Sequence, residues 1–214
     1  MLEKLKENIT ALKAHITLDE GEEEEAYLDS KDNWTVGIGH LLSAEQTDRE
    51  LRAMGLEDEL DNWEGFKITD AQMHELLDID IDDTMTMLKI SFDATELAKL
   101  DSVRFISLFS MAYQLGSVVK FPAMVDAIKR ADWDRAADEM VYSCGMKKNK
   151  RSQWYKDTPN RCQKMSDGMR WGAWENPKAG DPVTEISASL KEHEIRQLTD
   201  AQLLAEIKRR MEQA

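Results

Sequence analysis

Residues 19–42 read DEGEEEEAYLDSKDNWTVGIGHLL, and they pass from a run of carboxylates to a segment of alternating bulky and small side chains. The alternation is strict from 34 to 40, which is the period of a β-strand. One face of that strand is bulky, and the opposite face is nearly bare backbone with the hydroxyl of Thr35. Glycine within a strand often marks the close approach of a backbone or a ligand. A polar turn at 30–33 should fold Asp29 back opposite Thr35, where an acid and a hydroxyl could polarise a water molecule over an extended substrate.

Helices are predicted both before and after this hairpin in the sequence. The first helix should end at Gly21, a natural C-cap. It presents one apolar stripe, formed by Leu2, Leu5, Ile9, Leu12 and Ile16. Ser43 could cap a second helix through about residue 54. Thr69 and Gln72 form a capping box that should start a long amphipathic helix.

The run VRFISLFSMAYQL, residues 103–115, is apolar almost all round, which predicts a helix buried in a helical bundle. Shorter helices are expected at 122–130, 133–142 and 160–174. Prolines and a glycine after residue 176 then break the pattern, and helical spacing resumes at 190–211.

These elements predict a predominantly helical α+β protein. A small β-hairpin lobe is joined by a long helix to a helical lobe, and a helical tail follows. We place the main domain at residues 1–176 and the linker with its helical extension at 177–214. The tail is amphipathic without an excess of basic residues, so we expect packing or oligomerisation from it rather than membrane insertion. We expect a monomer, with the tail as the segment through which copies could associate.

The net charge of −14 is unevenly distributed along the chain. Residues 1–66 hold six Lys or Arg against eighteen Asp or Glu, whereas residues 147–170 hold eight against two. Affinity for nucleic acid depends on phosphate contacts, so we expect no nucleic-acid partner for so acidic a chain. A basic segment facing an acidic site suits an anionic polymer with a neutral backbone. Residues 147–151 taken alone are at least as well explained as a solvated loop.

Targeting and cofactor signals are sparse. No window approaches the eighteen or more uncharged apolar residues of a membrane span. The amino-terminal segment MLEKLKENITALKAH is charged and lacks the apolar core of a secretory signal, so we expect the protein to stay in the cytoplasm where it is made.

Cys144 and Cys162 form no metal pattern, and two isolated thiols are more often unpaired than bridged. No three histidines share metal-ligand spacing, and we expect neither a metal nor an organic cofactor.

Several short motifs follow one another in a fixed order between about residues 8 and 175. They are Glu20-Gly21, Tyr27-Leu28-Asp29, TVGIGHLL from Thr35 to Leu42, Ile68-Thr69, Asp80, LDSVR from Leu100 to Arg104, Gln114-Leu115-Gly116, Trp133-Asp134, and Trp154-Tyr155 followed by Thr158-Pro159-Asn160-Arg161. In this order and spacing they resemble the T-even bacteriophage lysozymes, glycoside hydrolase family 24. The resemblance leaves about the last forty residues outside it.

The resemblance implies roles for three residues. Glu20 would be the general acid of a glycosidase, and Asp29 and Thr35 would position the attacking water, with single displacement and inversion. Such a reaction needs room for the water, so the carboxyl groups of Glu20 and Asp29 should lie about 6.5–9.5 Å apart. Composition alone could not select Glu20, because residues 19–25 contain six carboxylates.

Substrate-binding positions follow from the same resemblance, and they are Leu41, Tyr113, Gln114, Asn160 and Arg161. Tyr113 and Gln114 could equally be core packing, and an arginine in a basic segment is usually a surface residue.

His40 is not expected to be catalytic. It belongs to the packed face of its strand, and Asp80 matches the family's partner for that histidine. We therefore expect a structural ion pair between His40 and Asp80.

The implied function is that of an endolysin, which hydrolyses the β-1,4 bond between N-acetylmuramic acid and N-acetylglucosamine in bacterial peptidoglycan. Without a signal sequence, the enzyme would wait in the host cytoplasm until a holin-type protein opens the membrane. The alternative is a virion-associated, lysozyme-like protein retained for wall binding or as a structural part of a phage tail. Detection of the protein in purified particles would separate the two.

Overall fold

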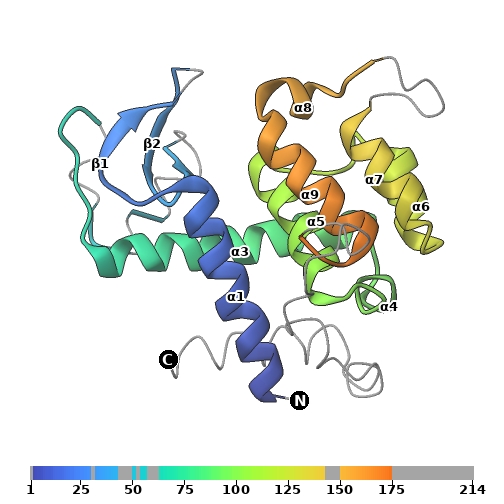
Figure 1. The fold of residues 1–214 in the computed structure, drawn as a ribbon. Coiled ribbons are helices and arrows are strands. Elements are labelled where there is room, and N and C mark those ends of the chain that lie inside the picture. The colour runs from blue at the N-terminus through green and yellow to red at the C-terminus, as the bar shows by residue number, and fades with distance from the viewer. Residues whose placement is uncertain are drawn as a thin grey trace. The chain divides into compact units, whose positions relative to one another are not determined.

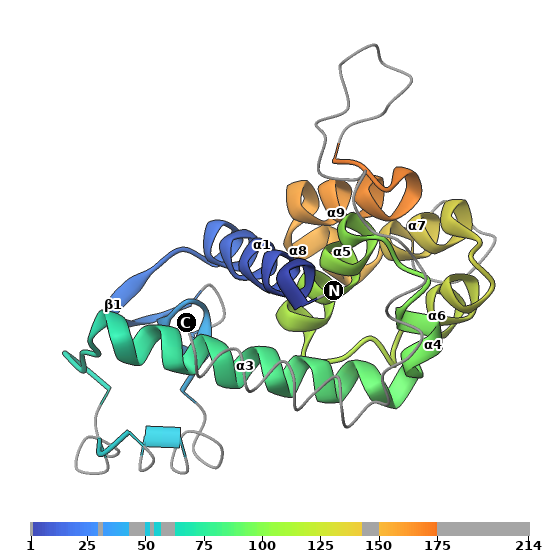
Figure 2. The same cartoon turned by 90° about the horizontal axis from the view of Figure 1, so that it is seen from below.

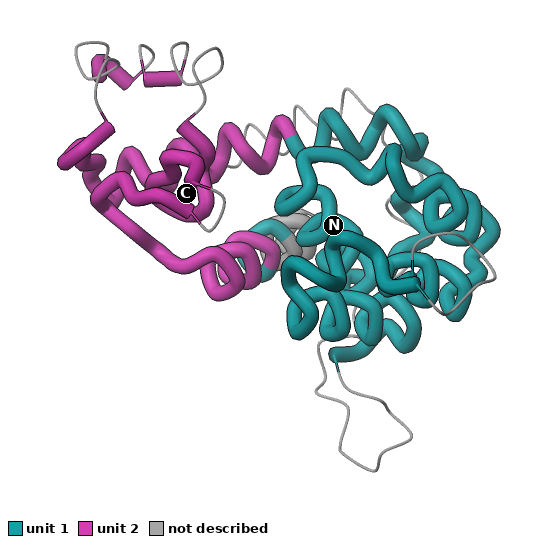
Figure 3. Tube along the Cα trace, turned by 90° about the horizontal axis from the view of Figure 1, so that it is seen from above, with its two compact units in different colours: residues 1–11, 84–214 teal, residues 12–83 magenta. Residues whose placement is uncertain are grey.

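The structure is a computed structural model that describes residues 2–29, 32–42, 50–51, 54–56, 63–142 and 150–174, with the backbone alone at 2–8. The chain forms two compact units (Figure 3). The hairpin unit comprises residues 12–83, and the helical unit comprises residues 1–11 and 84–214. Both divisions fall inside helices, so the chain passes between the units twice through helical backbone.

The hairpin unit starts within α1 (Leu2–Glu20) and continues into a three-stranded antiparallel sheet (Figure 1). The strands follow the order β1 (Glu23–Leu28), β2 (Trp34–Gly37) and β3 (His40–Leu41). The amide of Gly21 donates to the carbonyl of Thr17 at 2.8 Å, and α1 ends where the sequence predicts. The core of this unit consists of apolar side chains that are almost fully buried, among them Leu12, Ile16, Val36, Ile38, Leu76 and Leu77.

The predicted strand over 34–40 is wrong in its second half. β2 ends at Gly37, and the chain then reverses so that His40 pairs with Val36. Gly37 and Gly39 both take left-handed backbone, at φ 67° and 74°, a conformation that costs other residues roughly 1–2 kcal/mol. The alternation of bulky residues and glycine therefore encodes a tight turn, because the glycines that leave one face bare also permit the reversal.

The expected register of the first hairpin is wrong by two residues. Tyr27 pairs with Thr35, and Asp29 lies opposite Asn33, whose carbonyl accepts the amide of Asp29 at 2.9 Å. Residues two apart on a strand share a face. Asp29 therefore extends the face that carries Tyr27 and Thr35, and it lies diagonally across from Thr35.

The long helix α3 (Asp70–Ser91) begins at the predicted capping box. The amide of Thr69 donates to Gln72 Oε1 at 2.8 Å, and the amide of Gln72 donates back to Thr69 Oγ1 at 3.3 Å. The helix is continuous across the division between the units (Figure 2). Five residues of its expected apolar stripe are buried, namely Met73, Leu76, Leu77, Ile81 and Leu88, and the sixth, Met85, is half-buried.

The described part of the helical unit continues after α3 with further helices. These are α4 (Ala94–Leu97), α5 (Ser102–Leu115), α6 (Pro122–Lys129), α7 (Trp133–Val141), α8 (Gln153–Asp157) and α9 (Pro159–Trp171). Helix α5 is the buried helix that the sequence predicts, and Leu108 and Phe109 have no exposed surface. A β-carbon on Gly168 of α9 would collide with Ser107 Oγ of α5, so glycine allows the two helices to approach closely.

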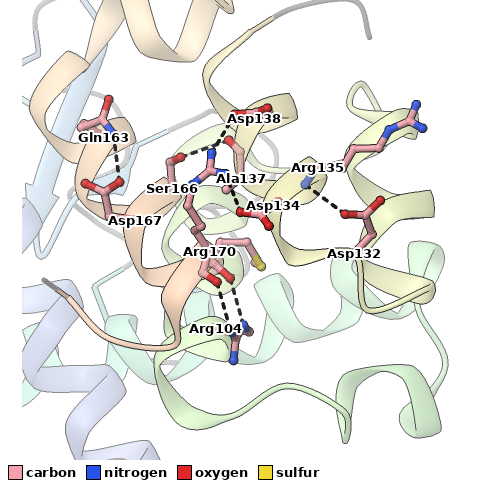
Figure 4. Close-up of polar contacts among 11 residues, drawn as sticks. Arg104, Asp132, Asp134, Arg135, Ala137, Asp138, Gln163, Ser166, Asp167 and Arg170 are labelled. Carbon is pink, nitrogen blue, oxygen red and sulfur yellow. Dashed lines mark hydrogen bonds and ion pairs between the residues drawn. The ribbon is translucent and has the colours of Figure 1, made fainter. Parts of the chain in front are cut away.

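Two arginines connect α9 to its neighbours (Figure 4). Arg104 of α5 donates from Nε to the carbonyl of Met169 at 2.9 Å and from Nη2 to that of Arg170 at 3.1 Å. The last carbonyls of a helix lack partners within it, so this guanidinium caps α9. Arg170 pairs with Asp134 at 2.8 Å and with Asp138 at 2.7 Å, both on α7. Charged contacts thus join α5, α7 and α9.

The helices predicted at 122–130, 133–142 and 160–174 are confirmed as α6, α7 and α9. The short helices α4 and α8 were not predicted, because four or five residues are too few to show a helical period. The tail helix, the linker and the domain boundary at 176 lie outside the described residues, as does most of the helix expected after Ser43. Among the described residues, no helix is long and apolar enough to cross a membrane.

Candidate active site

Glu20 is the last residue of α1, and its carboxyl group lies against the turn between β2 and β3. A β-carbon on Gly39 would lie 3.0 Å from Glu20 Oε2 and 3.1 Å from its Cγ and Cδ. A side chain at position 39 would therefore press on this carboxyl group more tightly than ordinary contact allows, and Glu20 would have to give way by a few tenths of an ångström. A helix end and a glycine turn together fix where this acid lies.

Asp29 and Thr35 are connected through Asn33. The Asp29 carboxylate accepts the Asn33 backbone N–H at 2.9 Å and the side-chain Nδ2 at 3.1 Å. The hydroxyl of Thr35 donates to the carbonyl oxygen of Asn33 at 3.3 Å. Thr35 is only 5% exposed. The predicted acid and the predicted hydroxyl thus belong to one chain of hydrogen bonds.

Tyr27 shows that Glu20 and Asp29 share one electrostatic neighbourhood. Burial raises the pKa of the Tyr27 hydroxyl, and the negative charges of Glu20, Glu23 and Asp29 raise it further. Tyr27 also pairs with Thr35 across the sheet. The phenol therefore lies next to one predicted catalytic residue and is subject to the charges of the other two.

His40 is buried between two carboxylates. Its Nδ1 lies 3.0 Å from both carboxylate oxygens of Asp80, and its Nε2 lies 3.3 Å from Glu50 Oε2. The side chains of His40 and Glu50 are only 3% and 2% exposed. Burial lowers the pKa of His40, but the hydrogen bonds and charges of Asp80 and Glu50 outweigh it and raise the pKa to about 9. The expected contact with Asp80 is present, and Glu50 is a second partner that the sequence did not predict.

Leu41 lies in the hairpin unit, directly opposite Thr35 in the pairing of β2 with β3. It is 49% exposed, so its side chain is accessible to a ligand.

The other predicted substrate-binding residues belong to the helical unit. Gln114 Oε1 accepts the indole N–H of Trp154 at 2.6 Å and the hydroxyl of Thr158 at 3.3 Å. Arg161 donates to Ser110 Oγ from Nε at 3.1 Å and from Nη2 at 3.0 Å. Ser110 and Gln114 lie one turn apart on α5, so both contacts form a single polar seam where α5 meets α8 and α9.

Two predicted positions make simpler contacts. Tyr113 is half-buried and stacks on Phe109, with the ring centroids 6.4 Å apart. Asn160 is exposed in the first turn of α9.

No other reactive centre competes with this site in the described part of the chain. Cys162 is buried as a free thiol, and burial raises its pKa to about 12, so it is not a nucleophile at neutral pH. No group of three or more His, Cys, Asp and Glu residues that could hold a metal ion occurs among the residues that the structure describes.

Sequence reasoning did not assign a role to Asn33, Tyr27 or Glu50. Asn33 appeared only as a turn residue, and its contacts depend on the register of the hairpin. Tyr27 was part of a motif, without a function of its own. Glu50 lies in an acidic segment, where a solvated side chain is the usual outcome. Only a tertiary contact with His40 distinguishes it.

The sequence is similar to known proteins over the part of the chain that holds the three predicted catalytic residues. The family model described as phage lysozyme matches residues 18–155, which include Glu20, Asp29, Thr35 and Gln114. Two proteins of Dictyostelium discoideum match across nearly their full length. "Probable T4-type lysozyme 1" is 26% identical over 173 residues, covering 77% of this chain and 96% of its own. "Probable T4-type lysozyme 2" is 28% identical over 178 residues, covering 79% and 99%.

The contact between Gly39 and Glu20 predicts the effect of one methyl group. Gly39→Ala should lower the activity on purified cell walls several-fold, because the new β-carbon must push the Glu20 carboxyl group aside by a few tenths of an ångström. Clearing rates at matched concentrations of folded protein measure this effect.

Gly65→Ala is the matched control for that variant. Gly65 has a similar φ of 78°, but a β-carbon added there would meet no atom within 4 Å. Both substitutions strain a left-handed backbone and should lower the melting temperature. If both variants lose activity equally, backbone strain and not the contact with Glu20 is the cause.

The buried His40 cluster predicts a fall in stability with rising pH. The folded-state pKa of about 9 lies above the ordinary value of 6.5. Stabilisation is therefore complete below pH 6.5 and is lost as the pH rises through 9. The free energy of unfolding should fall by about 2 kcal/mol between pH 6 and pH 8.5, as measured by urea denaturation. His40→Gln should flatten this slope, and an unchanged slope in that variant would assign the effect to other groups.

Proposed function

We propose that this chain, which belongs to the phage lysozyme family and is therefore a lysozyme-type hydrolase, cuts bacterial peptidoglycan. The bond that it cuts is the β-1,4 bond between N-acetylmuramic acid and N-acetylglucosamine. One observation carries the proposal. Glu20 lies against the Gly39 turn, while Asp29 and Thr35 are linked on the same hairpin and both acids act on Tyr27. Glycoside hydrolysis requires two carboxyl groups. This sheet has two of them beside it, held by separate contacts.

The proposed reaction is a single displacement at the anomeric carbon of N-acetylmuramic acid. Glu20 gives its proton to the glycosidic oxygen as the bond from that oxygen to the anomeric carbon breaks. A water molecule held by Asp29 and Thr35 attacks the opposite face of the sugar, and Asp29 accepts one proton from it. The product is an α-configured reducing end, and solvent returns one proton to Glu20 and removes one from Asp29.

We propose that the predicted substrate-binding residues contact the glycan. Leu41 offers an exposed apolar surface next to Thr35. The two bonds accepted by Gln114 Oε1 fix the orientation of its amide. Arg161 carries a charge that attracts the acidic stem peptides, and Asn160 and Tyr113 are the chain neighbours of Arg161 on α9 and of Gln114 on α5. Residues 147–170 contain more Lys and Arg than Asp and Glu, and this positive charge suits the same anionic polymer.

We further propose that the protein acts as an endolysin that reaches the wall from the cytoplasm through a membrane lesion made by a holin-type protein. Membership in the phage lysozyme family supports this proposal.

The central test uses purified cell walls and soluble glycan strands. The wild-type protein should clear the walls and produce new N-acetylmuramic acid reducing ends, which are α-configured when observed by NMR immediately after cleavage. Glu20→Gln should lose at least about 10³-fold in rate, because it removes the proton donor and keeps the shape.

Two outcomes would contradict separate parts of the proposal. Equal clearing by wild type and Glu20→Gln would overturn the assignment of the acid. A β-configured product would overturn the inverting mechanism while leaving hydrolysis intact. Gln163→Ala serves as the control, because Gln163 makes an exposed side-chain contact with Asp167 within α9 and takes no part in the proposed site.

The cytoplasmic route predicts how producing cells behave. The turbidity of a bacterial culture expressing the protein should stay constant until the inner membrane is permeabilised, and it should then fall within minutes. Cells expressing Glu20→Gln should remain turbid after the same treatment. Lysis of intact cells without permeabilisation would contradict a requirement for a second protein.

A further inference from the structure

We propose that Asn33 is a positioning residue that orients both Asp29 and Thr35 toward the attacking water, and that Thr35 accepts a hydrogen bond from this water rather than donating one. This inference rests on the proposed function and adds to it a residue and a direction for each hydrogen bond.

Asn33 contacts Asp29 through two separate groups. Its backbone N–H donates to Oδ1 at 2.9 Å, and its side-chain Nδ2 donates to Oδ2 at 3.1 Å and to Oδ1 at 3.3 Å. Only the nitrogen of an amide side chain is attracted to a carboxylate, so these contacts also fix which way the amide is turned. Asp29 in turn donates its own N–H to the Asn33 carbonyl at 2.9 Å. The carboxylate is therefore held by a closed set of contacts between positions 29 and 33.

Asn33 contacts Thr35 through its carbonyl oxygen, which lies 3.3 Å from Thr35 Oγ1. A carbonyl oxygen can only accept, so the hydroxyl proton of Thr35 points at Asn33. A hydroxyl group has one proton and two lone pairs. With its proton engaged, Thr35 can act toward a further partner only as an acceptor.

The direction of these bonds determines how the water is presented. Asp29 as a carboxylate and Thr35 with its proton engaged both accept hydrogen bonds. A water between them is therefore held through its two hydrogens. Its oxygen lone pairs then remain available for the anomeric carbon, and the hydrogen directed at Asp29 is the one that Asp29 removes. A donating Thr35 would instead occupy a lone pair of the attacking oxygen.

The backbone contacts of Asn33 do not depend on its side chain, which makes the side chain separately testable. Asn33→Ala removes the Nδ2 donor from Asp29 and keeps the amide and carbonyl. Asn33→Asp keeps the shape but places a like charge beside Asp29. Asn33→Ser shortens the side chain and retains a donor.

The experiment measures kcat and KM on soluble glycan strands, with thermal unfolding as a parallel measurement. Asn33→Ala should lower kcat about tenfold with KM within twofold of wild type, because the substrate still binds but the base is misoriented. Asn33→Asp should lower kcat further, and Asn33→Ser should recover part of the loss. Gln163→Ala removes a comparable exposed contact between an amide and a carboxylate, from Nε2 to Asp167 Oδ1 at 3.0 Å, and should leave kcat unchanged.

Thr35 provides the second arm of the same experiment. Thr35→Ser retains an acceptor and should keep most of kcat, whereas Thr35→Val should lose activity with little change in KM. Asn33→Ala with the kcat of wild type would overturn the role of Asn33, as would a loss confined to KM or melting temperature. If Asp29→Asn and Thr35→Val are also fully active, the proposed function itself fails, and the two failures are therefore distinguishable.

Discussion

A buried imidazolium between two carboxylates fixes the part of the hairpin unit on which the candidate site depends. His40 contacts Asp80 on α3 and Glu50 outside the sheet. Leaving one charge of such a group without its partners in a protein interior costs several kcal/mol, so the three side chains hold β3 in a single position on α3. His40 directly follows Gly39, and this ionic cluster therefore also sets the turn against which Glu20 lies.

The candidate site combines contacts of very different range in sequence. Asp29, Asn33 and Thr35 lie within seven residues of one another and are arranged by a single hairpin. Glu20 lies at the end of a helix, against the turn at Gly39. Local hydrogen bonds thus place the pair proposed to hold the water, while packing of a helix end against a turn places the proposed acid.

Local signals in the sequence predicted most of the helices. The capping box at Thr69 and the apolar run of α5 depend on neighbouring residues alone, and both predictions are confirmed. The turn at Gly37 escaped prediction because alternating glycines fit both a strand and a reversal. The register error had the same origin, since pairing is set by the turn and not by the alternation. Glu50 could not be predicted, because its burial beside His40 is a tertiary effect.

The division into two units has a consequence for how such a protein can diversify. Every residue proposed to handle protons or water lies between positions 12 and 83, whereas Gln114 and Arg161 belong to a separate seam of α5, α8 and α9. If this seam binds the glycan as proposed, substitutions along it would retune the preferred wall chemistry without disturbing the reaction proposed for the hairpin unit. Selection for different wall chemistries would then act on one unit while the other keeps its residues unchanged.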